Sequence, residues 1–230
     1  QRQMCIRDRE CGADVGLAFD GDADRVLAID ENGQIVDGDK IMTVIGLDMK
    51  ENGKLPDNTI VATVMSNLGF FVMGEENGIN IKRTKVGDRY VLEEMLKNNH
   101  LIGGEQSGHV ILLEHNTTGD GLVTGIQLVS VLKHSGKHMS ELASAMQVYP
   151  QVLINANVKN ELKNEENYMK FPEIKQAIES LEDEFKDTGR VLIRPSGTEP
   201  LVRVMIEGKD ENLIEKIARE LADLFEAKLN

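Results

Sequence analysis

Two cysteines in 230 residues are too few for a small scaffold held together by disulfides. The sequence also lacks any run of 18 apolar residues and any apolar segment typical of a secretory leader. We therefore expect neither a membrane span nor a secreted protein, and we predict a cytoplasmic location.

Basic residues are also scarce. The chain has 26 lysines and arginines against 39 aspartates and glutamates, which gives a formal net charge of −13 at pH 7. Nucleic acids and anionic membranes attract basic surfaces, so this balance argues against both as partners. A small phosphorylated ligand is still allowed, because it needs only a local cluster of cations.

The remaining composition is ordinary for a soluble globular protein, with 40% hydrophobic and 28% charged residues. The length suits one large domain or two small ones of about 100–200 residues each. Residues 1–9 have neither helical nor strand periodicity, so we expect a mobile terminus or a foreign leader there and leave them out of the fold prediction.

Apolar runs and helical spacings alternate as far as about residue 148, which predicts an α/β fold. Ser66 and Asn67 are good residues to begin a helix. A later predicted helix is supported by the spacing of Leu122, Ile126, Val129 and Leu132. Strands are predicted over residues 15–19, 26–29, 59–65, 79–84, 101–102 and 110–113, and helices over residues 68–76, 90–96 and 122–133.

Beyond about residue 150 the order of elements becomes strand, helix, strand, strand, helix, which predicts a small α+β domain. The strands are predicted over residues 152–158, 191–193 and 201–206, and the helices over residues 174–185 and 213–224. We find no internal repeat and no low-complexity segment.

The first loop whose residues suggest a chemical function, residues 20–25 (DGDADR), follows an apolar strand. Asp20, Asp22 and Asp24 would repel one another strongly unless a cation lay between them. Carboxylate oxygens suit a hard divalent ion such as Mg²⁺ or Ca²⁺. Arg25 offers a planar donor group that could hold a phosphoryl oxygen beside the metal.

Three other interpretations of this loop are weaker. An acidic surface turn is the simplest. An EF-hand would use Glu31 at its twelfth position, but Arg25 stands where glycine is needed, and strands flank the loop. A phosphatase with Asp20 as nucleophile would leave Asp24 and Arg25 unexplained.

The second loop, residues 103–109 (GGEQSGH), has flexible glycines beside polar side chains. Glu105, Gln106, Ser107 and His109 would present donors and acceptors along one short arc, which suits a polyhydroxylated ligand such as a sugar. A glycine-rich turn with incidental polar residues is the alternative, and His109 alone is as compatible with a structural role.

The third loop, residues 194–200 (RPSGTEP), combines guanidinium, hydroxyl and backbone amide groups. This set predicts an anion site, most plausibly for a phosphate monoester, although an ordinary hairpin turn would also fit. The residues expected to bind the anion are Arg194, Ser196, Gly197, Thr198 and Arg203.

Residues 84–90 (TKVGDRY) form a fourth and weaker candidate between a predicted strand and a predicted helix. Helix N-termini favour anions, and Lys85 and Arg89 add positive charge. A connecting loop with exposed charges explains the same residues.

Taken together and in this order, the loops resemble those of the α-D-phosphohexomutase family. Residues 20–25 are similar to its metal loop, residues 104–109 to its sugar loop and residues 194–203 to its phosphate loop. Gln106, together with residues 84–90, most resembles the bacterial branch that acts on glucosamine phosphates.

The resemblance implies a reversible phosphoryl shift between glucosamine 6-phosphate and glucosamine 1-phosphate, through a phosphoserine and a bisphosphate intermediate. Mannose or glucose phosphates would be the substrates of other branches. The implied roles are Mg²⁺ binding for Asp20, Asp22 and Asp24, phosphoryl contact for Arg25, sugar binding for Glu105 and Ser107, proton transfer for His109, and phosphate binding for Arg194, Ser196, Gly197, Thr198, Arg203, Lys85 and Arg89.

The resemblance also implies a domain plan. The family has four domains, so we expect residues 10–35 to be a remnant of the second and residues 36–148 to be a complete third domain of α/β/α type with a mixed sheet. Residues 149–230 would be the C-terminal α+β domain. The remaining partners would be the missing N-terminal domains, a phosphosugar and a second copy in a homodimer.

The family's nucleophilic serine lies in an S-H-N-P motif, which this chain does not contain. We therefore expect the chain alone to have no mutase activity, either as the C-terminal part of a mutase or as a non-catalytic module that binds sugar phosphates. A coupled assay that detects glucosamine 1-phosphate formed by the purified chain would contradict this expectation.

Overall fold

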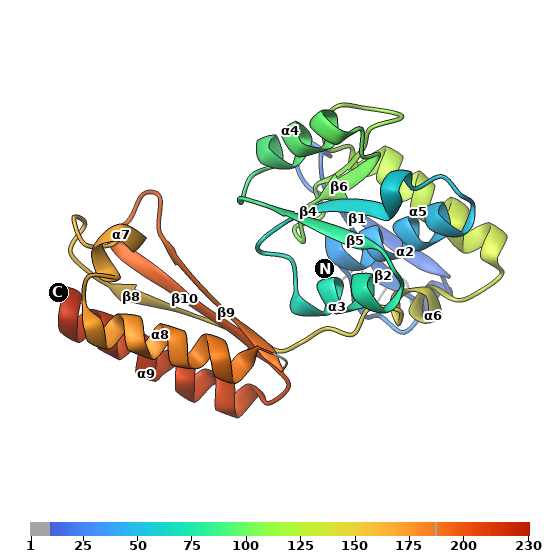
Figure 1. Ribbon diagram of the computed structural model, residues 1–230. Coiled ribbons are helices and arrows are strands. Elements are labelled where there is room, and N and C mark those ends of the chain that lie inside the picture. Colours follow the sequence, from blue (N-terminus) through green and yellow to red (C-terminus); the bar gives the residue numbers. More distant parts are fainter. Residues whose placement is uncertain (1–9, 187) are drawn as a thin grey trace. The chain divides into compact units, whose positions relative to one another are not determined.

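The computed structural model describes residues 10–186 and 188–230. The predicted leader, residues 1–9, lies outside the described residues. The chain divides into two compact units, the first ending at Val148 and the second being Tyr149–Asn230 (Figure 1).

The first unit opens with a small antiparallel sheet in the order β1-β2-β3, formed by Val15–Phe19, Val26–Asp30 and Ile35–Val36. Phe19 pairs with Val26, so the hairpin closes directly around the DGDADR loop. Gly33 has a φ of 81° in the following turn, a backbone conformation that glycine adopts without strain.

A second, mixed sheet has the order β5-β4-β6-β7. Strand β4 runs parallel to β5 and β6, and β7 is antiparallel to β6. All residues of the central strand β4 are buried, as expected for a strand covered on both faces. The prediction of an α/β domain with a mixed sheet is confirmed. The strands are β4 Thr59–Thr63, β5 Asn80–Thr84, β6 Ile102–Gly104 and β7 Val110–Leu112.

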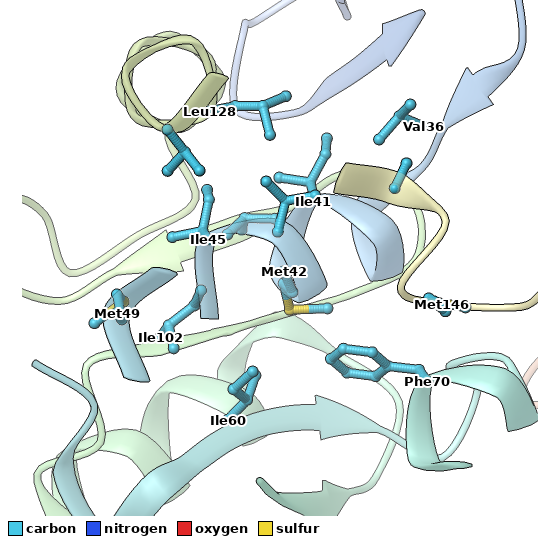
Figure 2. Packing of buried hydrophobic residues seen from close by; sticks show 14 of the residues in the cluster. Val36, Ile41, Met42, Ile45, Met49, Ile60, Phe70, Ile102, Leu128 and Met146 are labelled. Carbon is cyan, nitrogen blue, oxygen red and sulfur yellow. The ribbon is translucent and has the colours of Figure 1, made fainter. Parts of the chain in front are cut away.

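Helix α2 (Gly38–Glu51) forms the centre of this unit, yet the sequence analysis made no prediction for it. Figure 2 shows its Ile41, Met42 and Ile45 among side chains from several other elements, including Ile60 and Leu128. Its buried residues include Gly38, Asp39, Thr43 and Gly46 beside the apolar ones, so small and polar residues interrupt the apolar spacing that would indicate a helix.

The predicted cap of helix α3 (Leu68–Glu76) is confirmed, because the Asn67 side chain accepts a hydrogen bond from the Gly69 N–H at 3.0 Å. Helix α5 (Gly121–Ser135) ends at Gly136, whose φ of 67° is left-handed. The remaining helical segments of this unit are η1 Pro56–Asn58, α4 Asp88–Asn98 and α6 Met139–Ala143.

Helix α5 buries a different face from the one that its leucine and isoleucine spacing indicates. Leu122 and Ile126 are 59% and 62% exposed, whereas Leu128 is fully buried. Small residues explain the rotation: a Cβ at Gly125 would lie 2.9 Å from the Leu17 Cδ1 atom, so the helix packs onto β1 through its glycine side.

The second unit is an antiparallel sheet in the order β8-β10-β9 with helices α8 and α9 side by side along it (Figure 1), which confirms the predicted α+β class. Tyr168 and Phe225 meet edge to face in its core, with ring centroids 5.2 Å apart. Its elements are β8 Gln151–Asn157, α7 Glu165–Tyr168, α8 Pro172–Phe185, β9 Gly189–Pro195, β10 Leu201–Gly208 and α9 Glu211–Leu229.

Among the described residues, none of the helices combines the length and the apolar character that crossing a membrane requires.

The two faces of α5 can be compared directly by mutation. We expect Leu128→Ala to lower the free energy of unfolding by ~2–5 kcal/mol, because it removes buried apolar contacts and leaves a cavity. Leu122→Ala on the exposed face should change it by less than about 0.5 kcal/mol. Urea denaturation followed by circular dichroism measures both, and similar losses in the two variants would contradict the burial of this helix.

Candidate functional site

The β1–β2 hairpin presents the three aspartates of residues 20–25 together. One ligand oxygen from each of Asp20, Asp22 and Asp24 lies within 4.8 Å of the others, close enough to bind one cation. The backbone at Ala23 has a left-handed φ of 59°, which turns the loop sharply between the second and third carboxylates.

Arg25, the last residue of this loop, lies beside two of its carboxylates. The Arg25 backbone N–H donates to the Asp20 Oδ1 atom at 3.3 Å. The side-chain Nε atom lies 3.8 Å from the Asp20 Oδ2 atom and 3.9 Å from the Asp24 Oδ1 atom. The side chain is half exposed, so the guanidinium both offsets the acidic charge and stays accessible to a ligand.

The β6–β7 turn carries the GEQSGH loop against the acidic loop of residues 20–25. The Glu105 N–H donates to the His109 carbonyl, and the Val26 N–H donates to the Gly108 carbonyl at 3.1 Å. Gly108 has a φ of 96°, and a Cβ there would lie 2.3 Å from the Val26 carbonyl oxygen. Only glycine allows the two backbones to approach this closely. Ser107 stays exposed at the tip.

Two further hydrogen bonds join each loop to the helix that follows the other loop. The Gly38 N–H, at the start of α2, donates to the Gln106 carbonyl at 3.0 Å. The Gly121 N–H, at the start of α5, donates to the Ala23 carbonyl at 2.9 Å. The two loops and the two helix N-termini therefore form one reciprocally bonded junction.

The same Asp-Gly pair begins both helices. Asp37 caps α2 by accepting from the Lys40 N–H, and Asp120 caps α5 by accepting from the Val123 N–H. Asp37, Asp120 and Gly121 were not among the predicted site residues, and no internal repeat was predicted. The Asp-Gly pair after each loop-bearing hairpin is a signal in the sequence that could have indicated them.

His109 is buried between the two loops. Its Nδ1 lies 3.0 Å from the Asp24 Oδ2 atom, and its Nε2 accepts a hydrogen bond from the Gly119 N–H at 3.1 Å. Proton transfer by this ring would require one of these bonds to break, so that role stays a prediction.

Side chains of the sugar loop also fix neighbouring segments. The Glu105 Oε1 atom accepts from the Gly87 N–H at 3.1 Å, which ties residues 84–90 to this site. The Gln106 side-chain NH₂ group donates to the Asp37 Oδ2 atom at 3.2 Å. The Glu105 and Gln106 side chains thus bind neighbouring segments at Gly87 and Asp37, and both remain partly exposed.

The backbone of residues 84–90 is bonded to Glu105 through Gly87, but the two predicted cations of this segment, Lys85 and Arg89, do not share that contact. Lys85 is exposed. Arg89 pairs with Glu93 on its own helix, with the Arg89 Nε atom 2.8 Å from the Glu93 Oε1 atom, and this hydrogen bond raises the pKa of Arg89. The Arg89 guanidinium is therefore engaged away from the sugar loop.

In the second unit, the predicted phosphate loop joins β9 to β10. Arg194 and Arg203 are direct cross-strand partners in the sheet. The buried Ser196 holds the loop, since its N–H donates to the Leu201 carbonyl and its Oγ accepts from the Glu199 N–H at 3.2 Å. Gly197 and Thr198 form the exposed tip.

The two arginines place like charges side by side on neighbouring strands. Burial and then the like charge of Arg203 hold the pKa of Arg194 below its ordinary value. Within the described part of the chain, the Arg203 Nε atom is buried without a hydrogen-bond partner. The nearest acidic group recorded for Arg203 is the exposed Glu199, 3.8 Å away. A bound anion would offset the repulsion between the two guanidinium groups.

Comparison with known proteins places the chain in a family. Residues 37–149 match the family model for the phosphoglucomutase/phosphomannomutase alpha/beta/alpha domain III, and residues 153–224 match the C-terminal domain of the same family. The chain belongs to the phosphoglucomutase/phosphomannomutase family, which confirms the resemblance to the α-D-phosphohexomutases.

Two curated relatives indicate which members of the family this chain is most similar to. The chain is 66% identical over 220 residues to a phosphoglucosamine mutase of Acetivibrio thermocellus, covering 96% of this chain and 49% of that protein. It is 61% identical over 229 residues to a phosphoglucosamine mutase of Ruminiclostridium cellulolyticum, covering 100% of this chain and 51% of that protein. The chain therefore spans about half the length of the curated relatives it matches.

Solved structures share the fold. The N-acetylphosphoglucosamine mutase of Aspergillus fumigatus has a TM-score of 0.76 at 21% identity, over 92% of this chain and 48% of that one. A phosphoglucomutase/phosphomannomutase family protein of Burkholderia thailandensis has a TM-score of 0.75 at 20% identity, over 100% of this chain and 50% of that one.

Proposed function

We propose that the chain is the C-terminal part of a phosphoglucosamine mutase, an isomerase that interconverts glucosamine 6-phosphate and glucosamine 1-phosphate. The observation that carries the proposal is the direct Val26–Gly108 hydrogen bond, which sets the acidic loop beside the polar sugar loop. The high identity to proteins named phosphoglucosamine mutase supports this branch of the family over the mannose and glucose branches.

In this proposal Asp20, Asp22 and Asp24 hold Mg²⁺, and their closely spaced oxygen ligands fit that hard ion. When bound, Mg²⁺ neutralises charge on the transferring phosphoryl group. Arg25 lies beside the same carboxylates and would contact that group. A structural neighbour from Aspergillus fumigatus, described as a complex with GlcNAc-6P and magnesium, supports the choice of ion.

Glu105 and Ser107 are proposed to bind sugar hydroxyls, with Lys85 close by on the segment that Glu105 holds. Gln106 would contact the amino group of the sugar. Because its side-chain NH₂ group donates to Asp37, its side-chain carbonyl oxygen is left to accept a hydrogen bond from an ammonium. Phosphate binding by Arg89 has less support than phosphate binding by Lys85, because the Arg89 guanidinium is paired with Glu93.

The second unit would hold the phosphate that does not transfer. The paired guanidiniums offer bidentate donors, the exposed loop tip adds hydroxyl and backbone donors, and the buried Ser196 keeps the loop in shape. The residues proposed for this role are Arg194, Ser196, Gly197, Thr198 and Arg203.

The rest of the reaction requires groups outside this sequence. We propose that a phosphoserine on N-terminal domains of the full-length protein supplies and recovers the phosphoryl group, since the chain has no S-H-N-P motif. A cytoplasmic location and a homodimer also belong to the proposal.

The metal site can be tested in the chain itself. We expect Mg²⁺ to bind to the wild-type chain, and Asp22→Asn to weaken the affinity at least 10-fold because it removes one anionic ligand. Isothermal titration calorimetry measures both. Asp183→Asn, on helix α8 of the other unit, is the control and should leave the affinity unchanged. Equal binding by wild type and Asp22→Asn would show that these aspartates hold no metal.

The phosphate site is tested by titration with glucosamine 6-phosphate. We expect Arg194→Ala to weaken binding by ~1.5–3 kcal/mol, the range of a charge-assisted hydrogen bond. Arg219→Ala is the matched control, because that exposed arginine pairs with Glu215 on α9. An affinity that Arg194→Ala leaves unchanged would mean that the phosphate lies elsewhere.

A further inference from the structure

We propose that Asn155, on strand β8, is a further binding residue for the phosphate that the second unit holds. The inference rests on the proposed function for Arg194 and Arg203, and it adds a hydrogen-bond donor from a third strand to that site. Asn155 lies outside the four loops that the sequence motifs indicate, because its own segment shows only the alternation of a half-buried strand.

The register of the sheet places Asn155 beside the arginine pair. Strand β10 is the central strand, and its Arg203 is the direct cross-strand partner of Arg194 on β9 and of Asn155 on β8. Directly opposite residues of antiparallel strands share a face of the sheet, with Cβ atoms ~4.5–5.5 Å apart. The three side chains therefore form one polar row across the whole sheet.

This polar row lies on the face of the sheet that the helices leave open. Val202 and Val204, the neighbours of Arg203 along β10, are fully buried in the core cluster that includes α8 and α9. Ala156, the neighbour of Asn155, belongs to the same cluster. Successive side chains of a strand point to opposite faces, so Arg203 and Asn155 point away from that core.

The surroundings of the row limit where an anion can bind. The next row on the same face is apolar, because Met205 pairs with Leu153 and Leu192. On the other side of the polar row, the β9–β10 loop presents Gly197 and Thr198 at its exposed tip. An anion on this face finds hydrogen-bond donors only along the polar row and at the loop, which brings it within reach of Asn155.

An amide side chain suits this position better than a charged one. Burial and the like charge of Arg203 already lower the pKa of Arg194, so a third cation would add further repulsion. A carboxylate would compete with the anion for the guanidinium groups. The Asn155 amide is neutral and has two N–H donors, so it can bind a phosphate oxygen without either cost.

The Asn155 amide is also available to a ligand. The side chain is exposed, and among the described residues none forms a hydrogen bond with this amide. Asn157, two residues further along β8, differs in this respect, because its Nδ2 atom donates to the Glu226 Oε1 atom at 3.2 Å. Asn155 can therefore bind phosphate without giving up a bond that supports the fold.

Isothermal titration calorimetry of the whole chain with inorganic phosphate and with glucosamine 6-phosphate tests the inference. We expect Asn155→Ala to weaken both affinities ~5–10-fold through the loss of one hydrogen bond to a charged group. Asn155→Asp has nearly the same shape and should weaken them more, because its carboxylate pairs with Arg203 and repels the anion. Asn212→Ala, at an exposed asparagine of helix α9, is the matched control and should leave both affinities unchanged.

The variants distinguish failure of this inference from failure of the phosphate site. If Arg194→Ala weakens phosphate binding and Asn155→Ala does not, the role of Asn155 is overturned while the phosphate site stands. A loss seen with glucosamine 6-phosphate but not with inorganic phosphate would place Asn155 at the sugar and would also overturn the inference. If wild type binds no phosphate, the site and the role of Asn155 fail together.

A measurement on the unmodified chain separates contact with the ligand from an effect on the fold. ¹⁵N NMR follows the side-chain NH₂ signals of Asn155 and Asn212 while inorganic phosphate is added. We expect the Asn155 signals to shift with the same midpoint as the calorimetric titration, and the Asn212 signals to stay in place. Asn155 signals that do not move at saturating phosphate would overturn the inference.

Discussion

The N–H of Gly38 donates to the Gln106 carbonyl in the β6–β7 loop, and the N–H of Gly121 donates to the Ala23 carbonyl in the acidic loop of residues 20–25. Each loop therefore keeps its shape only if the helix that follows the other loop starts at the right residue. This mutual dependence explains why glycine opens both helices, because a Cβ at either position would meet a loop carbonyl. The side-chain chemistry of the site depends on this backbone junction.

The sequence predicted the elements that have a strong local signal and missed those defined by tertiary packing. The Asn67 cap and the helix after it depend on neighbouring residues, so they were predictable. Helix α2 was not, because small and polar residues interrupt its apolar spacing. Helix α5 was predicted correctly from its helical spacing, but that spacing did not indicate that Gly125 approaches β1 while Leu122 stays exposed.

The candidate site also contains residues that the sequence could indicate and partners that it could not. Closely spaced residues with shared chemistry, such as Asp20, Asp22 and Asp24, could be selected from the sequence, and the structure gathers their ligand atoms. The partners that fix them lie far along the chain, as with His109 and Asp24. No local pattern encodes such contacts. Their assignment to metal, sugar and phosphate remains a prediction.

The paired arginines of the second unit have a thermodynamic consequence beyond recognition. Folding brings Arg194 and Arg203 together as cross-strand neighbours, so the sheet is completed against their repulsion. An anion that binds only the folded sheet removes that opposition and shifts the folding equilibrium by mass action. If the proposed phosphate site is correct, the stability of this unit is coupled to the phosphate content of its surroundings.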